Sequence, residues 1–122
     1  MKNLISIIEI PVTDFQRATK FYEAILGVAI EAMEMDGVEL GVIPSDEGTV
    51  SVVLAKGNDY QPTTSGAVLY LNMAEDLQPT LDKVTSNGGN VIVPKSEISP
   101  EMGYFALFID TEGNKLGLHS MS

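Results

Sequence analysis

Few side chains in this chain could do acid–base or metal chemistry. His119 is the single histidine, and cysteine is absent from the sequence. Without cysteine there is no thiolate zinc site, no iron–sulfur cluster, no cysteine nucleophile and no disulfide framework. An iron site built from two histidines and a carboxylate needs two imidazoles, and a symmetric homodimer with two equivalent sites supplies one copy of His119 to each. Two-histidine sites are therefore excluded, whereas a site with one histidine is not.

Glu9 is the second candidate because it is the single charged residue of the apolar segment Leu4–Val12. A charge in such a segment is costly unless it is paired or functional. His119 alternates with Leu116 and Leu118 along a predicted strand, so it points to the opposite face from them. Either candidate could instead belong to a buried hydrogen-bonded pair, or point to solvent at a strand end.

Tyrosines and methionines are weaker candidates for lining a cavity. Tyr70 and Tyr104 lie in predicted strands and could offer a phenol to a ligand, although packing with the hydroxyl at a rim is the commoner role. Tyr60 lies in a polar linker, and a role in covering a cavity is the less favoured interpretation. Met33 and Met35 could line an adaptable apolar pocket, but core or dimer packing is favoured.

Composition and charge narrow the class of protein. The chain has 122 residues, 44% hydrophobic and 20% charged, which is typical of one soluble globular domain. A net charge of −10 with scattered basic residues disfavours nucleic acid and anionic membranes as partners. No apolar run approaches the ~20 residues of a membrane span, and the N-terminal segment lacks a signal-peptide pattern. We expect a cytoplasmic protein, consistent with the absence of cysteine.

Two stretches of the chain repeat one order of predicted elements, a strand, a helix and three further strands. The first helix begins after a capping residue at Thr13 and ends at Gly27. The second helix covers Glu75–Ser86, with Leu77, Leu81 and Val84 facing inward. The predicted strands are Leu4–Val12, Ile30–Met35, Val38–Ile43, Val50–Ala55, Ala67–Asn72, Asn90–Pro94, Tyr104–Asp110 and Lys115–His119.

The turns and loops divide these repeats. Asp36 and Gly37 predict a tight hairpin, and Thr111–Asn114 predicts the last hairpin turn. Ser96–Gly103 is expected to be a long loop and a plausible cavity flap. We expect a single domain made of a first module (1–58), a linker (59–66) and a second module (67–122), because the intervening segment is polar and lacks periodicity.

Three motifs carry a resemblance to a known family: PVTDF and FYEAILG near the start, and DTEGNKLGLH near the end. Together with the repeat between them, they resemble the vicinal oxygen chelate superfamily of glyoxalase I, bleomycin-resistance proteins and extradiol dioxygenases. The resemblance covers essentially the whole chain. It implies an α+β fold of two βαβββ modules whose mixed sheet curls into a cup, and a homodimer.

Metal-dependent members of that family place four ligands on the cup. The corresponding positions here are Ile7, the segment Ser51–Ala55, the segment Ala67–Leu71 and Gly117, and none carries the family's ligand. Glu9 and His119 are each displaced by two residues in the same sense, so they share strand faces with Ile7 and Gly117. If the first and final strands are neighbours, as the resemblance implies, Glu9 and His119 would floor the cup as an acid–base pair or as two ligands of a divalent metal.

The resemblance therefore implies a glyoxalase-like protein with a small-molecule cavity, and three functions compete. One is lyase or isomerase chemistry on a small molecule with adjacent oxygens, with Glu9 and His119 as catalytic or metal-binding residues and Tyr70 and Tyr104 contacting the substrate. The second is sequestration of a ligand without chemistry, as in bleomycin-resistance relatives. The third is an interaction module. The lone histidine excludes extradiol dioxygenase and two-histidine glyoxalase chemistry. A single divalent metal ion is the cofactor left open, and no nucleotide or flavin motif occurs.

Overall fold

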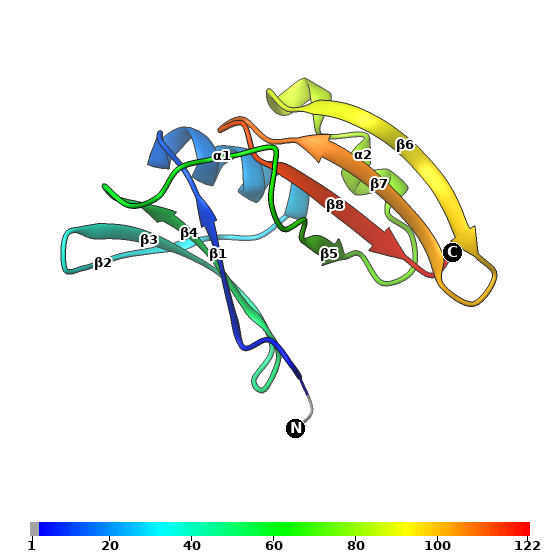
Figure 1. Cartoon of the computed structure of the whole chain (residues 1–122), viewed down its shortest axis with the longest axis horizontal. Coiled ribbons are helices and arrows are strands. Elements are labelled where there is room, and N and C mark those ends of the chain that lie inside the picture. Colours follow the sequence, from blue (N-terminus) through cyan, green and yellow to red (C-terminus); the bar gives the residue numbers. More distant parts are fainter. Residues whose placement is uncertain (1–2) are drawn as a thin grey trace.

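The first half of the chain forms a four-stranded mixed sheet with one helix. The computed structural model describes residues 3–122, so Met1 and Lys2 of the predicted first module lie outside it. The strand order is β1-β4-β3-β2, with β1 parallel to β4 and the other neighbours antiparallel (Figure 1). The elements are β1 (Ile7–Pro11), α1 (Phe15–Leu26), β2 (Glu31–Met35), β3 (Val38–Ile43) and β4 (Ser51–Lys56).

The second half repeats this arrangement in a second sheet of the order β5-β8-β7-β6. Again the first strand is parallel to the last, here β5 to β8. The predicted α+β fold of two βαβββ units is confirmed. The elements are β5 (Tyr70–Asn72), α2 (Gln78–Leu81), the 3₁₀ turn η1 (Thr85–Asn87), β6 (Asn90–Ser99), β7 (Gly103–Ile109) and β8 (Lys115–Ser120).

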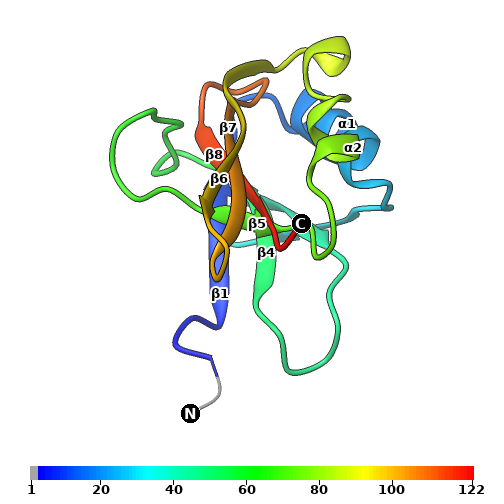
Figure 2. The ribbon, with the colours of Figure 1, turned by 90° about the vertical axis from the view of Figure 1, so that its right-hand side faces the viewer.

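Both helices lie on one side of the two sheets, and the side chains on that side form one shared core (Figure 2). The Phe21 ring of α1 lies 6.1 Å from the Phe108 ring of β7, so the first helix packs on the second sheet. Leu77, Leu81 and Val84 are buried, as their spacing predicts. Full burial of each such side chain stabilises the fold by roughly 1.5–3 kcal/mol, so the shared core holds the two sheets together.

The opposite side of the sheets, here called the open face, carries the alternate side chains of the strands. Residues paired across neighbouring strands point to the same side, so the register defines this face. The linker between β4 and β5 also lies on this side (Figure 2). The open face comprises Ile7, Glu9, Met33, Met35, Leu40, Val42 and Val53 from the first sheet, and Tyr70, Asn72, Phe105, Leu107, Gly117 and His119 from the second.

The helix α1 begins one residue later than its sequence pattern predicts. Asp14, rather than Thr13, is the N-cap, and its side chain accepts a hydrogen bond from the Arg17 N–H. The Thr13 hydroxyl instead donates to Glu112, a residue of the second unit. The predicted end of the helix at Gly27 is confirmed, since Gly27 has the left-handed φ of 67° that favours glycine.

The predicted second helix, Glu75–Ser86, is broken into a short α-helix and a 3₁₀ turn. The hydrogen bonds tighten from the i−4 to the i−3 pattern after Asp82, where Lys83 N–H donates to the Thr80 carbonyl. The side chains of Ser86 and Asn87 both donate to the Lys83 carbonyl, which competes with helical bonding. Among residues 3–122, no helix is long and apolar enough to cross a membrane.

The predicted loop Ser96–Gly103 is largely strand, so that prediction is wrong. Strand β6 continues to Ser99 and pairs with β7 through register shifts, so the two strands form one long hairpin. The predicted end of this strand at Pro94 is also wrong, because β6 is an edge strand and its free edge tolerates a residue without an N–H. By contrast, only Tyr70–Asn72 of the predicted strand Ala67–Asn72 pairs in the sheet.

Candidate functional site

Glu9 lies on the open face of β1, where its carboxylate has one side-chain partner among the described residues. Its neighbours Ile8 and Ile10 pack toward the core, so strand alternation directs Glu9 outward. The Tyr60 hydroxyl donates to Glu9 Oε1 over 2.9 Å. That hydrogen bond raises the pKa of Tyr60 above its ordinary value. The linker therefore places a phenol on the carboxylate, a contact that sequence reasoning did not favour.

A small hollow next to Glu9 joins the two units. Its volume is about 160 Å³, and β1, the linker and the start of β8 contribute its walls. The Asn114 side chain donates to the Pro11 carbonyl over 2.7 Å and accepts from the Thr63 N–H, which holds these three segments together. The hollow is lined by Glu9, Ile10, Pro11, Thr63, Ala67, Leu69, Asn114, Lys115 and Leu116.

His119 lies near the end of β8, also on the open face, in one row with Asn72 and Phe105. Its Nε2 lies 2.6 Å from the Met102 carbonyl oxygen. A carbonyl can only accept, so Nε2 carries a hydrogen and donates it. The imidazole is thereby tied to the turn between β6 and β7.

The structure does not join Glu9 to His119 by a hydrogen bond. Glu9 shares its hollow with Lys115, and His119 follows Lys115 by four residues on β8. Four residues of strand span about 13 Å, and Gly117 between them is covered by the Tyr70 ring. The two strands approach where β1 ends and β8 begins, and diverge beyond that point (Figure 1). Direct proton transfer between the two side chains has no support in this arrangement.

The two tyrosines predicted to contact a ligand lie on opposite sides of the second sheet. Tyr70 is on the open face and is 50% exposed. Tyr104 instead packs against the core, and Lys95 Nζ lies 4.9 Å from its ring centroid. Strand alternation explains the correction: Tyr104 shares the side of Ala106, whereas the open face receives its neighbour Phe105.

The side chains do not fit the metal site that the family resemblance implies. Ile7 is aliphatic and 64% exposed, and the space above Gly117 is filled by the Tyr70 ring. Among residues 3–122, no group of three or more histidine, aspartate or glutamate side chains is arranged to hold a metal ion. Glu9 and His119 each have a different partner, so they form no ligand pair ready for a metal.

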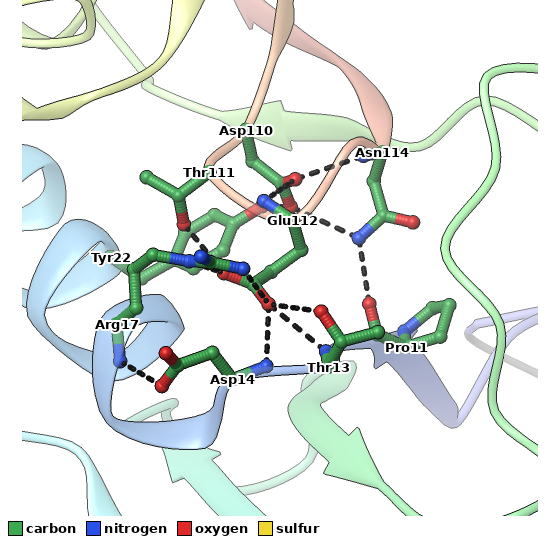
Figure 3. A network of polar contacts seen from close by, with 9 residues as sticks. All are labelled: Pro11, Thr13, Asp14, Arg17, Tyr22, Asp110, Thr111, Glu112 and Asn114. Atoms are coloured by element: carbon green, nitrogen blue, oxygen red, sulfur yellow. Dashed lines mark hydrogen bonds and ion pairs between the residues drawn. The ribbon is translucent and has the colours of Figure 1, made fainter.

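The densest polar network lies at the junction of the two units, at the N-terminus of α1 (Figure 3). Glu112 Oε1 accepts hydrogen bonds from the backbone N–H groups of Thr13 and Asp14, over 2.9 and 2.7 Å. Arg17 Nε donates to Glu112 Oε2 over 2.7 Å, and the Glu112 side chain is fully buried. Burial alone would raise the pKa of Glu112, but the hydrogen bonds from Arg17, Asp14 and Thr13 outweigh it and lower the pKa to about 2.

A second part of the same network is buried behind Glu112. Asp110 accepts from the Tyr22 hydroxyl over 2.6 Å and from the Asn114 backbone and side-chain N–H groups (Figure 3). Burial and the negative charge of Asp110 raise the pKa of Tyr22 well above its ordinary value. The sequence marked this TEGN segment as a hairpin turn and as part of a family motif, but its contacts with the distant N-terminus of α1 were missed. The network positions β1 beside β8, and with them the two halves of the open face.

Comparison with known proteins gives relatives of the same fold. The chain is 37% identical over 119 residues to a glyoxylase-like domain-containing protein from Didymella fabae, covering 90% of this chain and 88% of that protein. Its structure is similar to that of TnmS3, an antibiotic binding protein from Streptomyces sp. CB03234, with a TM-score of 0.71, 22% identity, and coverage of 100% and 99% of the two chains. It is also similar to a glyoxalase I variant from Zea mays, with a TM-score of 0.73 and 19% identity over 95% of this chain and 45% of that one.

Neither of these solved structures reaches 25% sequence identity, so their similarity shows the fold alone. The family assignment rests on the sequence. A family model for the Glyoxalase/Bleomycin resistance protein/Dioxygenase superfamily matches residues 4–118, nearly the whole chain. That match includes strands of both sheets and the motifs on which the resemblance was drawn, except for His119, the last residue of DTEGNKLGLH. The chain is a glyoxalase-like protein and belongs to the Glyoxalase/Bleomycin resistance protein/Dioxygenase superfamily.

Proposed function

We propose that this protein binds a small cationic molecule on its open face and does not transform it. The observation that carries the proposal is the presence of exposed apolar side chains on the same face as a carboxylate. Ile7, two residues from Glu9 on β1, is 64% exposed, and Tyr70 of β5 is 50% exposed. Met33 and Met35, on β2 at the other edge of the first sheet, are 44% and 55% exposed. Exposed apolar surface with a few polar groups is typical of ligand sites and interfaces.

Charge favours a cation over an anion as the ligand. The chain carries a net charge of −10, and its field attracts positive solutes. Glu9 sits at the edge of the hollow with its carboxylate held by a single side-chain bond from Tyr60, so a ligand ammonium could replace that phenol as donor. The description of TnmS3 as an antibiotic binding protein supports binding as a role for this fold.

Lyase or isomerase chemistry is the less supported alternative. In the form predicted from the sequence, Glu9 and His119 act as one acid–base pair, which requires contact within about 3.2 Å or through one water. Glu9 is bonded to Tyr60, and His119 is bonded to the Met102 carbonyl. Glu9 of β1 lies beside the start of β8, His119 lies near its end, and the covered Gly117 lies between those two parts of β8. Binding needs no such pair.

A dialysis experiment separates the two functions. Purified protein is equilibrated with a panel of cationic antibiotics and their neutral analogues. Each compound is then recovered, and its amount and molecular mass are measured by mass spectrometry. We expect cations to be retained and recovered unchanged, with a dissociation constant about fivefold higher for Glu9→Gln, equivalent to ~1 kcal/mol for an exposed charge pair. Glu47→Gln, in the exposed turn between β3 and β4, is the matched control and should bind as the parent does.

Two results would contradict this proposal. Consumption of a compound in a Glu9-dependent manner would establish catalysis instead of sequestration. Retention that is equal for cationic and neutral compounds, and equal in Glu9→Gln, would remove the assigned role of the carboxylate.

We also propose that the protein is a homodimer. Met33 and Met35 of β2 lie at the edge of the first sheet, on the open face, and are both exposed. Exposed apolar side chains on an edge strand are a favourable surface for a second copy. Analytical ultracentrifugation measures this directly, and a single species with the mass of one chain at micromolar concentration would exclude it.

A further inference from the structure

Position 117 requires glycine because the Tyr70 ring lies directly against it. An ideal Cβ at this position would lie 2.3 Å from Cδ2 and 2.5 Å from Cε2 of Tyr70, which no side chain could share. The backbone of Gly117 has no left-handed φ that would itself call for glycine. The register places Tyr70 of β5 directly beside Gly117 of β8. The missing side chain therefore lets the Tyr70 ring lie against the surface of the sheet.

The Tyr70 ring also contacts Phe105, and part of it is exposed to solvent. Phe105 of β7 lies with its ring centroid 6.4 Å from that of Tyr70 at an interplanar angle of 67°, an edge-to-face contact. Tyr70 is nevertheless 50% exposed, so much of the ring has no protein partner. A ring fixed by backbone on one side and by an aromatic neighbour at its edge presents a preorganised apolar surface to a ligand.

We propose that Tyr70, seated on Gly117 and packed against Phe105, is a stacking platform that selects a planar aromatic ligand. The inference rests on the proposed function, because it names the class of molecule that the open face binds. It also accounts for the misfit with a metal site, since the position that the family resemblance assigns to a metal ligand is here the seat of the ring. Aromatic stacking depends little on the substituents of the ligand ring. The Tyr70 platform therefore selects planar ligands, whereas Glu9 selects positively charged ones.

Two cationic probes, one planar and one not, separate the effect of ligand planarity from the effect of ligand charge. Proflavine is a planar aromatic cation, and 1-aminoadamantane is a compact aliphatic cation. We expect proflavine to bind the parent protein with its fluorescence altered, and Tyr70→Leu to raise its dissociation constant about tenfold. Tyr70→Phe keeps the ring and should change it less than twofold. Binding of 1-aminoadamantane, measured by calorimetry, should change less than twofold in both variants.

Gly117→Ala tests the seat of the ring. The added methyl must displace the Tyr70 ring, so proflavine binding should weaken severalfold. In a Tyr70→Leu background the same substitution should have no further effect, because there is no ring to displace. Should Gly117→Ala fail to fold, as judged by its thermal transition, the comparison of Tyr70→Leu with Tyr70→Phe carries the test alone.

The outcomes distinguish the platform from the proposed function. If Tyr70→Leu binds proflavine as the parent does while Glu9→Gln weakens both cations, the platform is wrong and cation binding on the open face stands. If the parent binds neither probe at millimolar concentration, both are wrong. If Tyr70→Leu weakens both probes equally, Tyr70 supplies general apolar contact, and selection of planar ligands is overturned.

Discussion

The junction between the two units and the open face are built in opposite ways. At the junction the fully buried carboxylate of Glu112 accepts from several donors, and the nearly buried Asp110 does the same. On the open face, large apolar side chains are exposed, and Glu9 and His119 have one side-chain hydrogen bond each among the described residues. The comparison indicates that specific polar contacts fix the angle between the sheets, while the open face is left free for a ligand.

The junction also shows how one unit completes the other. The first N–H groups of a helix have no partner within it and carry partial positive charge. Asp14 caps α1 from its own unit, and Glu112 from the second unit accepts from the N–H groups that precede it. Because the bonds to Glu112 span the two units, separation of the units would remove the shared acceptor of the Thr13 and Asp14 N–H groups. Within residues 3–122, Glu9 and His119 of the open face make no hydrogen bond of this kind between the two units.

Asp110→Ala should give the largest loss of stability. The substitution leaves the buried Tyr22 hydroxyl and the buried Asn114 backbone N–H without their acceptor. Each buried group left unpaired costs about 1–3 kcal/mol, so we expect the free energy of unfolding to fall by about 3 kcal/mol. Urea denaturation followed by circular dichroism measures it. Tyr22→Phe removes only one donor and is the control, with an expected loss of about 1 kcal/mol. An equal, small loss in both variants would show that the junction does not fix the fold.

Glu112→Gln should lower stability at neutral pH by about 2 kcal/mol, and this difference should shrink in acid. The folded pKa of about 2 lies below the ordinary 4.5, so the charged carboxylate contributes stability above pH 4.5. That contribution is lost as the pH falls from 4.5 toward 2. The difference in the free energy of unfolding between parent and variant, from urea titrations at pH 7, 4.5 and 3, should therefore be nearly constant down to pH 4.5 and clearly smaller at pH 3.

Glu101→Gln is the control for that pH series. Glu101 is exposed in the turn between β6 and β7, away from the network. We expect its unfolding free energy to follow that of the parent at every pH within about 0.5 kcal/mol. A gap between the parent and Glu112→Gln that persists unchanged at pH 3 would mean that the shape of the side chain, and not its charge, holds the junction.

Much of the architecture could be predicted from local sequence. Apolar runs and the turn at Asp36 and Gly37 predicted the strands of the first sheet, and alternation predicted that Glu9 shares a strand face with Ile7. The inward positions Leu77 and Leu81 were correct even though their helix is shorter than predicted. Burial pattern survives such a change because it depends on which residues are apolar, whereas helix length depends on competing hydrogen bonds.

The contacts of the candidate site depend on how distant segments meet, which no local pattern encodes. Glu112 lies 95 residues from Arg17 in sequence, and Tyr60 lies 51 residues from Glu9. His119 was expected beside Glu9, but its partner is the Met102 carbonyl of a hairpin that the sequence predicted as a loop. Tyr104 was placed on the wrong side of its sheet because nothing local distinguishes the two faces of an apolar strand.

The double substitution of Met33 and Met35 by serine should test the other side of the comparison. Both side chains are exposed, so the free energy of monomer unfolding should change by less than about 0.5 kcal/mol each. The proposed dimer should weaken, since its apolar contact area is removed. Sedimentation velocity at several concentrations and urea denaturation at low concentration measure the two effects separately. A loss of monomer stability like that of Asp110→Ala would show that the open face is part of the structural core.

Tyr60→Phe should have the smallest effect on stability and a readable effect on binding. The Tyr60 hydroxyl donates to Glu9 on the exposed open face, so its loss should change the free energy of unfolding by less than about 0.5 kcal/mol. A cationic ligand must replace that phenol to reach the carboxylate, so the variant should bind 1-aminoadamantane two- to threefold more tightly. Calorimetry measures this, and in a Glu9→Gln background the gain should disappear because the competing partner is gone. Weaker binding in Tyr60→Phe would instead show that the phenol contacts the ligand. The polar groups of the open face would then be positioned for ligand recognition, as those of the junction are positioned for structure.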